Sequence, residues 1–65
     1  MFKYRITFES EYCGLVEVGV KYTNDKQWFR NLVSELKNNI VEIRIDNVVV
    51  WNREESSIEL LKEVA

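Results

Sequence analysis

Histidine and proline are both absent from this 65-residue chain, and cysteine occurs only once, as Cys13. The lack of histidine removes the side chain that most often serves as general base, pH switch and metal ligand. A single cysteine cannot form a disulfide within the chain, and a free thiol is typical of proteins in a reducing cytoplasm. The only two glycines, Gly14 and Gly19, do not form a phosphate-binding loop. The sequence therefore predicts no catalytic site, no metal site and no cofactor.

Long apolar runs are absent as well. No stretch approaches the roughly 20 apolar residues of a membrane-spanning helix, and no basic segment precedes a short apolar one, as in a secretory signal. We therefore expect a cytoplasmic protein without membrane contact. The hydrophobic content of 46% is too high for a disordered chain. The length predicts a single domain, residues 1–65, close to the lower limit for folding without a disulfide or a metal.

Charge of neither sign dominates, since the formal net charge is only −2. Residues 1–53 are nearly balanced, whereas residues 54–65 carry four glutamates against Lys62. A protein dedicated to duplex DNA usually has a basic excess, and an inhibitor that mimics DNA would be far more acidic. The residue types with AT-rich codons are frequent, which favours an origin in a low-GC bacterium or in a phage or mobile element of such a host.

Strict alternation of apolar and polar residues predicts two strands at 2–9 and 15–22. The glycine between them predicts a hairpin turn. We expect both apolar rows on one core face, with Phe8 opposite Val16, and a register two residues away keeps these faces and is an open alternative. The expected core-face residues are Phe2, Tyr4, Ile6 and Phe8 in the first strand and Val16, Val18, Val20 and Tyr22 in the second.

A helix is predicted over residues 24–38, because its apolar residues recur at helical spacing. Asn24 and Gln27 resemble a capping box at its start, and Asn38-Asn39 favours an end in the left-handed conformation. The apolar stripe, all of it expected in the core, consists of Trp28, Phe29, Leu32, Val33 and Leu36.

Residues 41–46 again alternate, but the three valines and the tryptophan at 48–51 do not. Asp46-Asn47 favours a two-residue hairpin turn between these strands, since both residues tolerate positive φ. The turn sends alternate residues of the second strand to opposite faces. Those expected on the core face are Val48 and Val50, and those expected on the other face are Val49 and Trp51.

A short C-terminal helix is predicted over residues 57–64, where Ser56 and Glu59 resemble a capping box. We expect this helix, or its copy from a second subunit, to cover Val49 and Trp51 and to leave one edge of Trp51 free. The fold class is thus α+β with the order ββαββα. Its expected form is a four-stranded, mostly antiparallel sheet in the order 2-1-3-4, with one long helix on one face and a short C-terminal helix.

The free edge of Trp51, on the second face of the sheet, is the expected binding surface, with Arg44 and Arg53 as its polar rim. Tryptophan and arginine are the residues most enriched at interface hot spots. The expected partner-binding residues are Trp51, Val49, Arg44 and Arg53. We expect a homodimer, and a non-enzymatic protein-binding module that binds or inhibits a host protein, in particular one of host defence.

Nucleic-acid binding or regulation is the alternative function. Basic residues around an aromatic side chain on a sheet face are typical of several single-strand binders. The basic residues expected on that face are Lys3, Arg5, Lys21 and Arg44. Against this alternative, glutamates share the face, and Trp51 is the only aromatic residue expected on it, so an ordinary solvated face is the simpler interpretation.

Overall fold

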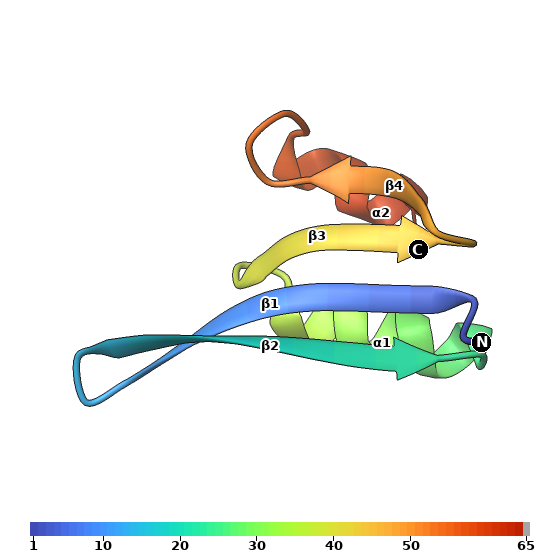
Figure 1. Ribbon diagram of the computed structural model, residues 1–65. Coiled ribbons are helices and arrows are strands. Elements are labelled where there is room, and N and C mark those ends of the chain that lie inside the picture. The colour runs from blue at the N-terminus through green and yellow to red at the C-terminus, as the bar shows by residue number, and fades with distance from the viewer. Residues whose placement is uncertain (65) are drawn as a thin grey trace.

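A computed structural model describes residues 1–64 and shows the predicted α+β fold in the order ββαββα (Figure 1). The elements are β1 (Tyr4–Tyr12), β2 (Leu15–Thr23), α1 (Lys26–Leu36), β3 (Ile40–Ile45), β4 (Val48–Asn52), a single 3-10 turn η1 (Ile58–Leu60) and α2 (Leu61–Val64). The strands form one sheet in the order β2-β1-β3-β4, and every neighbouring pair is antiparallel. The predicted strand order is therefore confirmed.

The register of the first hairpin follows from its turn. Cys13 and Gly14 are the only residues between the strands, and their φ angles are 52° and 79°. Positive φ at both positions is what the common two-residue hairpin turn requires. This turn places Tyr12 directly opposite Leu15, and the rest of the ladder follows without a bulge.

This register reverses the predicted faces of β2. Phe8 lies opposite Gly19, not opposite Val16, and Ile6 lies opposite Lys21. Directly opposite residues in an antiparallel pair project from the same face, so the apolar rows of β1 and β2 lie on opposite faces of the sheet. The predicted shared core face is wrong. A two-residue turn places even-numbered residues of one strand opposite odd-numbered residues of the other, whereas the predicted face requires Phe8 opposite Val16, two even-numbered residues.

Helix α1 begins two residues later than predicted. Asp25, not Asn24, is the N-cap, and its side chain accepts hydrogen bonds from the backbone N–H groups of Gln27 and Trp28, at 2.9 and 3.1 Å. Asn24 instead accepts a 2.7 Å hydrogen bond from the N–H of Lys3, which ties the start of the chain to this loop.

The helix packs one apolar face on the sheet. Phe29, Leu32 and Val33 are buried as predicted, whereas Trp28 lies at the edge of the stripe and is exposed. At the other end, the N–H of Asn39 donates a 2.6 Å hydrogen bond to the carbonyl of Leu36. The predicted left-handed ending is wrong, since neither Asn38 nor Asn39 has a positive φ.

The second hairpin has the predicted turn, with φ angles of 52° at Asp46 and 65° at Asn47. Its first pairs, Ile45 with Val48 and Arg44 with Val49, are also as predicted.

The ladder then shifts by one residue. Ile43 pairs with Trp51, so Val50 is left as the extra residue of a bulge. A bulge sends every later side chain of the strand to the other face. Trp51 therefore projects toward the helices and is only 3% exposed, and its predicted place on the second face is wrong.

The C-terminal segment packs over Trp51. The indole N–H of Trp51 donates a 2.9 Å hydrogen bond to the carbonyl of Ser57, and Leu61 of α2 is buried in the same core. The predicted cover of Trp51 by the C-terminal segment is thus confirmed, but on the face that α1 also covers. The predicted cover of Val49 and the predicted free edge of Trp51 are wrong, since Val49 stays exposed on the other face and Trp51 is buried. The predicted capping box is not formed: Ser57 is the N-cap of η1 and makes no side-chain capping bond.

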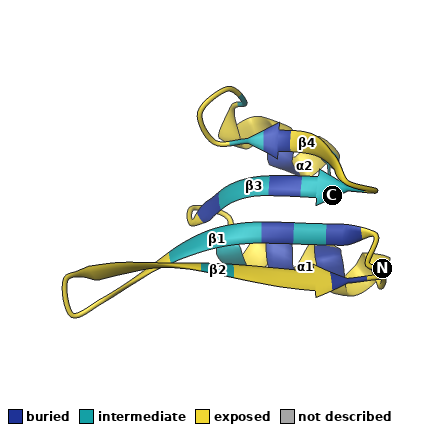
Figure 2. Cartoon of the chain, in the orientation of Figure 1, coloured by how far each residue is buried: buried dark blue, intermediate teal, exposed yellow. Residues whose placement is uncertain are grey.

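One core holds the two layers together, between the sheet and the two helices (Figure 2). The rings of Tyr4 and Phe29 stack in it with centroids 4.3 Å apart. Strand β2 contributes only Thr23 as a buried residue, and the rest of it is almost wholly exposed. The buried apolar residues are Tyr4, Ile6, Phe29, Leu32, Val33, Ile40, Ile43, Trp51 and Leu61.

Candidate functional site

Both helices lie on one face of the sheet, so the opposite face carries no other layer of residues 1–64. We call this opposite face the open face. Its composition follows from the strand register, since directly opposite residues share a face. The residues placed on it are Arg5, Thr7, Glu9 and Glu11 of β1, Val16, Val18, Val20 and Tyr22 of β2, Glu42 and Arg44 of β3, and Val49 and Asn52 of β4.

The outer part of the open face is an apolar row on the edge strand. We call Val16, Val18, Val20 and Tyr22 the β2 strip. These four side chains are 40 to 65% exposed. The ring of Phe2, also exposed, extends the row at one end, since its centroid lies 5.6 Å from that of Tyr22.

Part of the strip lies on a hairpin arm that extends beyond the rest of the sheet (Figure 1). Strand β3 pairs only with residues 4–8 of β1, so the ladder from Glu9 to Val18 has no third strand beside it. The tip carries further exposed apolar side chains, Tyr12 and Leu15. A projecting arm with apolar residues on both faces is accessible to a partner from either side.

Arg5 lies at the centre of the charged part of the open face, directly opposite Tyr22 on one side and Arg44 on the other. The Nε atom of Arg44 is 2.7 Å from a carboxylate oxygen of Glu42. The Nε atom of Arg5 is buried and makes no hydrogen bond to any described residue. Two guanidinium groups directly opposite each other repel, and Glu42 offsets the charge of only one of them.

A hollow of about 230 Å³ opens beside these two arginines. Phe2 and Tyr22 supply its aromatic side, and Arg5 and Arg44 supply its basic side. Lys3 also borders it, although its ammonium group lies 5.6 Å from the ring centroid of Tyr4. Sequence reasoning missed Phe2 and Tyr22 as members of this face, because it assigned both to the core.

The far side of the open face holds a bidentate ion pair. The guanidinium nitrogens of Arg53 lie 3.0 and 3.1 Å from the two carboxylate oxygens of Glu9. The hydrogen bonds from Arg53 lower the pKa of Glu9, and the hydrogen bonds to Glu9 raise the pKa of Arg53. The pair connects the end of β4 with the start of the projecting arm.

The predicted partner-binding residues are only partly brought together. Arg44 and Val49 face each other on the open face, and Arg53 lies near it in its ion pair with Glu9. Trp51 is buried under the C-terminal segment, so a partner that binds the open face does not contact it.

The predicted basic surface is also only partly formed. Arg5 and Arg44 are neighbours on the open face, whereas Lys21 lies opposite Ile6 and therefore projects from the helix-covered face. The same reversal of β2 moves Glu17 off the open face and brings Tyr22 onto it. The loop length between Tyr12 and Leu15 is the signal that could have identified this arrangement.

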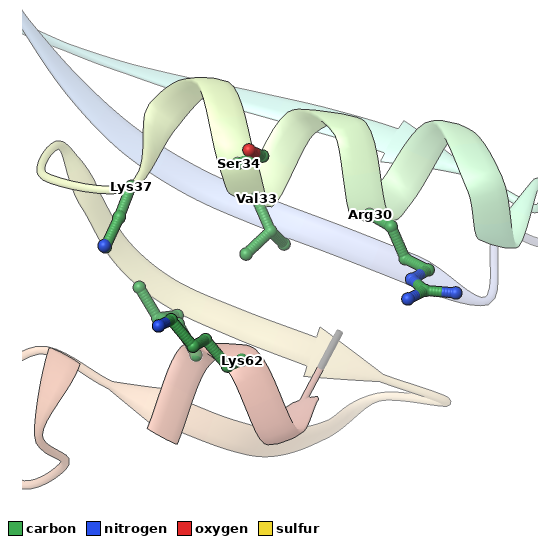
Figure 3. A pocket seen from close by; sticks show the side chains of 6 residues that line it. Arg30, Val33, Ser34, Lys37 and Lys62 are labelled. Carbon is green, nitrogen blue, oxygen red and sulfur yellow. The ribbon is translucent and has the colours of Figure 1, made fainter. Parts of the chain in front are cut away.

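A second hollow, of about 340 Å³, lies between the two helices on the other side of the molecule (Figure 3). Val33 and Leu61 line its apolar part. Three cationic side chains surround it, Arg30 and Lys37 from α1 and Lys62 from α2.

Cys13 is exposed in the first turn. Within the described chain, no three histidine, cysteine or carboxylate residues are grouped as a metal site would require. The described helices include none that is long and apolar enough to cross a membrane.

Comparisons of this chain with protein-family models, with curated proteins and with solved structures gave no match. The assignment of function therefore depends on the surfaces described above.

Proposed function

We propose that this protein is a non-enzymatic protein-binding module that uses the open face of its sheet. The observation that supports the proposal is the β2 strip, a row of four exposed apolar side chains on one face of one strand. Contiguous apolar patches on a small protein mark interaction sites, because their exposure to water is unfavourable unless a partner covers them. The strip continues into Phe2, so the apolar surface spans the length of β2.

The charges on the open face support a partner surface that is apolar with acidic groups beside it. Arg5 lines the hollow next to the exposed ring of Tyr22, and it makes no ion pair with a described residue. A carboxylate in the adjacent hollow would form a charge-assisted hydrogen bond with Arg5 and would relieve its repulsion with Arg44. The partner would thus gain specificity from the arginines and affinity from the strip.

The proposal extends to the biological setting. The small size and the many residues with AT-rich codons support an accessory protein of a phage or mobile element. Such a protein would bind a host protein and block its function by covering part of its surface. Host defence proteins are the first candidates for such a target.

Affinity capture with matched variants tests the proposal. The open-face variant combines Arg5→Glu with Val18→Lys in the β2 strip, and the control combines Arg30→Glu with Ile58→Lys, which are exposed residues outside the open face. Both variants carry the same change of charge. We expect the control to retain the bacterial proteins captured by the wild-type protein and the open-face variant to lose them. Equal capture by both variants, or loss in the control alone, would show that the open face is not the binding surface.

Single-stranded nucleic acid is a second candidate ligand, favoured by one observation. The hollow beside Arg5 and Arg44 has two aromatic rings, Phe2 and Tyr22, where the sequence predicted only one aromatic residue on the face. Stacking of bases on aromatic rings beside a basic groove is the usual arrangement of single-strand binders. Titration of a labelled oligonucleotide distinguishes the two functions. Nucleic-acid affinity falls steeply between about 50 and 200 mM salt and falls further in Tyr22→Ser, whereas a protein-binding module gives no saturable binding.

A further inference from the structure

Strand β2 is an edge of the sheet along its whole length. It pairs with β1 on one side and with no other strand of the described chain. Backbone hydrogen-bonding directions alternate along an antiparallel strand. Every second residue of β2 therefore directs its N–H and C=O groups away from β1, toward the open edge.

This edge lacks most of the features by which proteins prevent edge pairing. In most proteins the edge strands of a sheet are short, bulged, interrupted by proline or protected by charged residues, so that they do not pair with another chain. The other edge, β4, has five residues and a bulge at Val50. Strand β2 has nine residues, a ladder without a bulge and no proline, and Glu17 and Lys21 are its only charged residues.

We propose that two copies of this chain associate through β2, antiparallel, with a two-fold axis between Gly19 and Gly19 of the second copy. In this register Val18 lies opposite Val20 of the second copy, and Val16 lies opposite Tyr22. Glu17 lies opposite Lys21 of the second copy, and the symmetry gives this ion pair twice. The two four-stranded sheets become one sheet of eight strands, with the two β2 strips side by side on its open face.

Charge selects this register among the symmetric ones. A two-fold axis at Glu17 or at Lys21 places two like charges directly opposite each other, which is unfavourable. An axis at Val18 or Val20 leaves both charged residues opposite uncharged ones. Only the axis at Gly19 pairs each glutamate with a lysine.

Gly19 itself fits the centre of this joint. The ring of Phe8 lies across Gly19 so closely that a Cβ atom there would be 2.6 Å from Cζ of the ring. Cα atoms of opposite residues lie about 4.5 to 5.5 Å apart in an antiparallel pair, so the two Phe8 rings would approach each other across the axis. The interface between the two copies would then have the valines on the open face, and the phenylalanine rings and ion pairs on the helix-covered face.

This association goes beyond the proposed function and does not depend on it. The side chains of Glu17 and Lys21 project from the helix-covered face, so their substitution leaves the open face unchanged. Capture of a partner and self-association can therefore fail independently.

Charge reversal provides the test, with molecular mass measured by sedimentation over a range of concentrations and folding checked by circular dichroism. We expect the wild-type protein to sediment as a dimer at tens of micromolar. Glu17→Lys and Lys21→Glu should each raise the dimer dissociation constant about tenfold or more, because each places two like-charged pairs opposite each other. The double variant with both changes should regain the dimer.

Mixing the two single variants is the most specific arm of the test. A chain with Glu17→Lys has lysine at both positions, and a chain with Lys21→Glu has glutamate at both, so only the mixed dimer pairs opposite charges. We expect the equimolar mixture to form a heterodimer while each variant alone is largely monomeric. A monomeric wild-type protein would overturn the proposal, and so would a dimer that responds to neither reversal.

Discussion

The indole N–H of Trp51 donates a 2.9 Å hydrogen bond to the carbonyl oxygen of Ser57. This bond joins the last strand to the segment that leads into α2, whose Leu61 is buried against the same core. The bulge at Val50 makes the contact possible, because it moves Trp51 to the helix-covered face. The C-terminal segment is therefore attached to the sheet by polar and by apolar contacts, which also include the 2.7 Å hydrogen bond from the N–H of Ser56 to the carbonyl of Asn52.

Replacement of Trp51 by phenylalanine should be costly although it preserves an aromatic ring. The change removes the hydrogen bond to the carbonyl of Ser57, which keeps the N–H of Leu60 as a donor at 3.1 Å, and it leaves a gap in the core. Loss of one hydrogen bond costs about 0.5 to 1.5 kcal/mol, to which the lost packing of the larger ring adds. Denaturant unfolding followed by circular dichroism measures the loss. Trp28→Phe is the control, since Trp28 is exposed, and its effect should stay within about 0.5 kcal/mol.

Removal of residues 56–65 should expose Trp51. In a Trp28→Phe background, where Trp51 is the only tryptophan, we expect its emission to shift to longer wavelength and the protein to lose stability. Leu61→Ala should act in the same direction by about 2 to 5 kcal/mol, because Leu61 is only 2% exposed. An unchanged emission spectrum in the truncated protein would mean that the C-terminal segment does not cover Trp51.

Alternation of apolar and polar residues identified β1, β2 and β3, and the turn at Asp46-Asn47 identified β4, but these signals did not show which faces come together. In the first hairpin, the faces are set by the number of residues in the turn. The pairing of Phe8 with Val16 requires an odd-numbered loop, whereas Cys13 and Gly14 form a two-residue turn. The conformational preference of that turn prevails over the burial of a second apolar row, and the β2 strip is left exposed.

In the second hairpin, the turn at Asp46-Asn47 and the first pairs could be predicted, and the bulge at Val50 could not. Three consecutive valines give no periodic signal that distinguishes a regular strand from a bulged one. The bulge is favoured by tertiary packing, because it buries Trp51 beside Ile43, and this burial requires the C-terminal segment to be in place. Trp51 was consequently misplaced, whereas Arg44 and Val49, whose pairing precedes the bulge, lie on the face that was predicted for them.

Two alanine substitutions distinguish the core row from the exposed row. Ile6 is 1% exposed, so Ile6→Ala should destabilise the protein by about 2 to 4 kcal/mol through the cavity that it leaves. Val18→Ala should change the stability of the monomer by no more than about 0.5 kcal/mol, because Val18 is exposed. Equal losses of stability at the two positions, measured in dilute solution, would support the register expected from the sequence.

The ion pair between Glu9 and Arg53 should make a small, pH-dependent contribution to stability. Its hydrogen bonds lower the pKa of Glu9 in the folded protein relative to the unfolded chain. The contribution is therefore fully present above the ordinary pKa of glutamate and is lost as the pH falls through the lowered value. Titration of the Glu9 carboxyl by NMR should show its pKa rising toward the ordinary value in Arg53→Ala. The stability difference between wild type and Glu9→Gln should disappear at acidic pH.

Gly19→Ala should destabilise the protein even though alanine is the better strand residue by roughly 0.5 to 1 kcal/mol. The new methyl group would lie 2.6 Å from Cζ of Phe8 and about as close to the neighbouring ring carbons, at 3.0 and 3.1 Å. The ring must then rotate off Gly19, and overpacking of this kind costs about 1 to 3 kcal/mol. Replacement of the ring by the smaller leucine side chain removes the clash, so the loss of stability from Gly19→Ala should be smaller in a Phe8→Leu background. Thermal unfolding of the four proteins gives this coupling, and strictly additive effects would mean that Phe8 does not lie across Gly19.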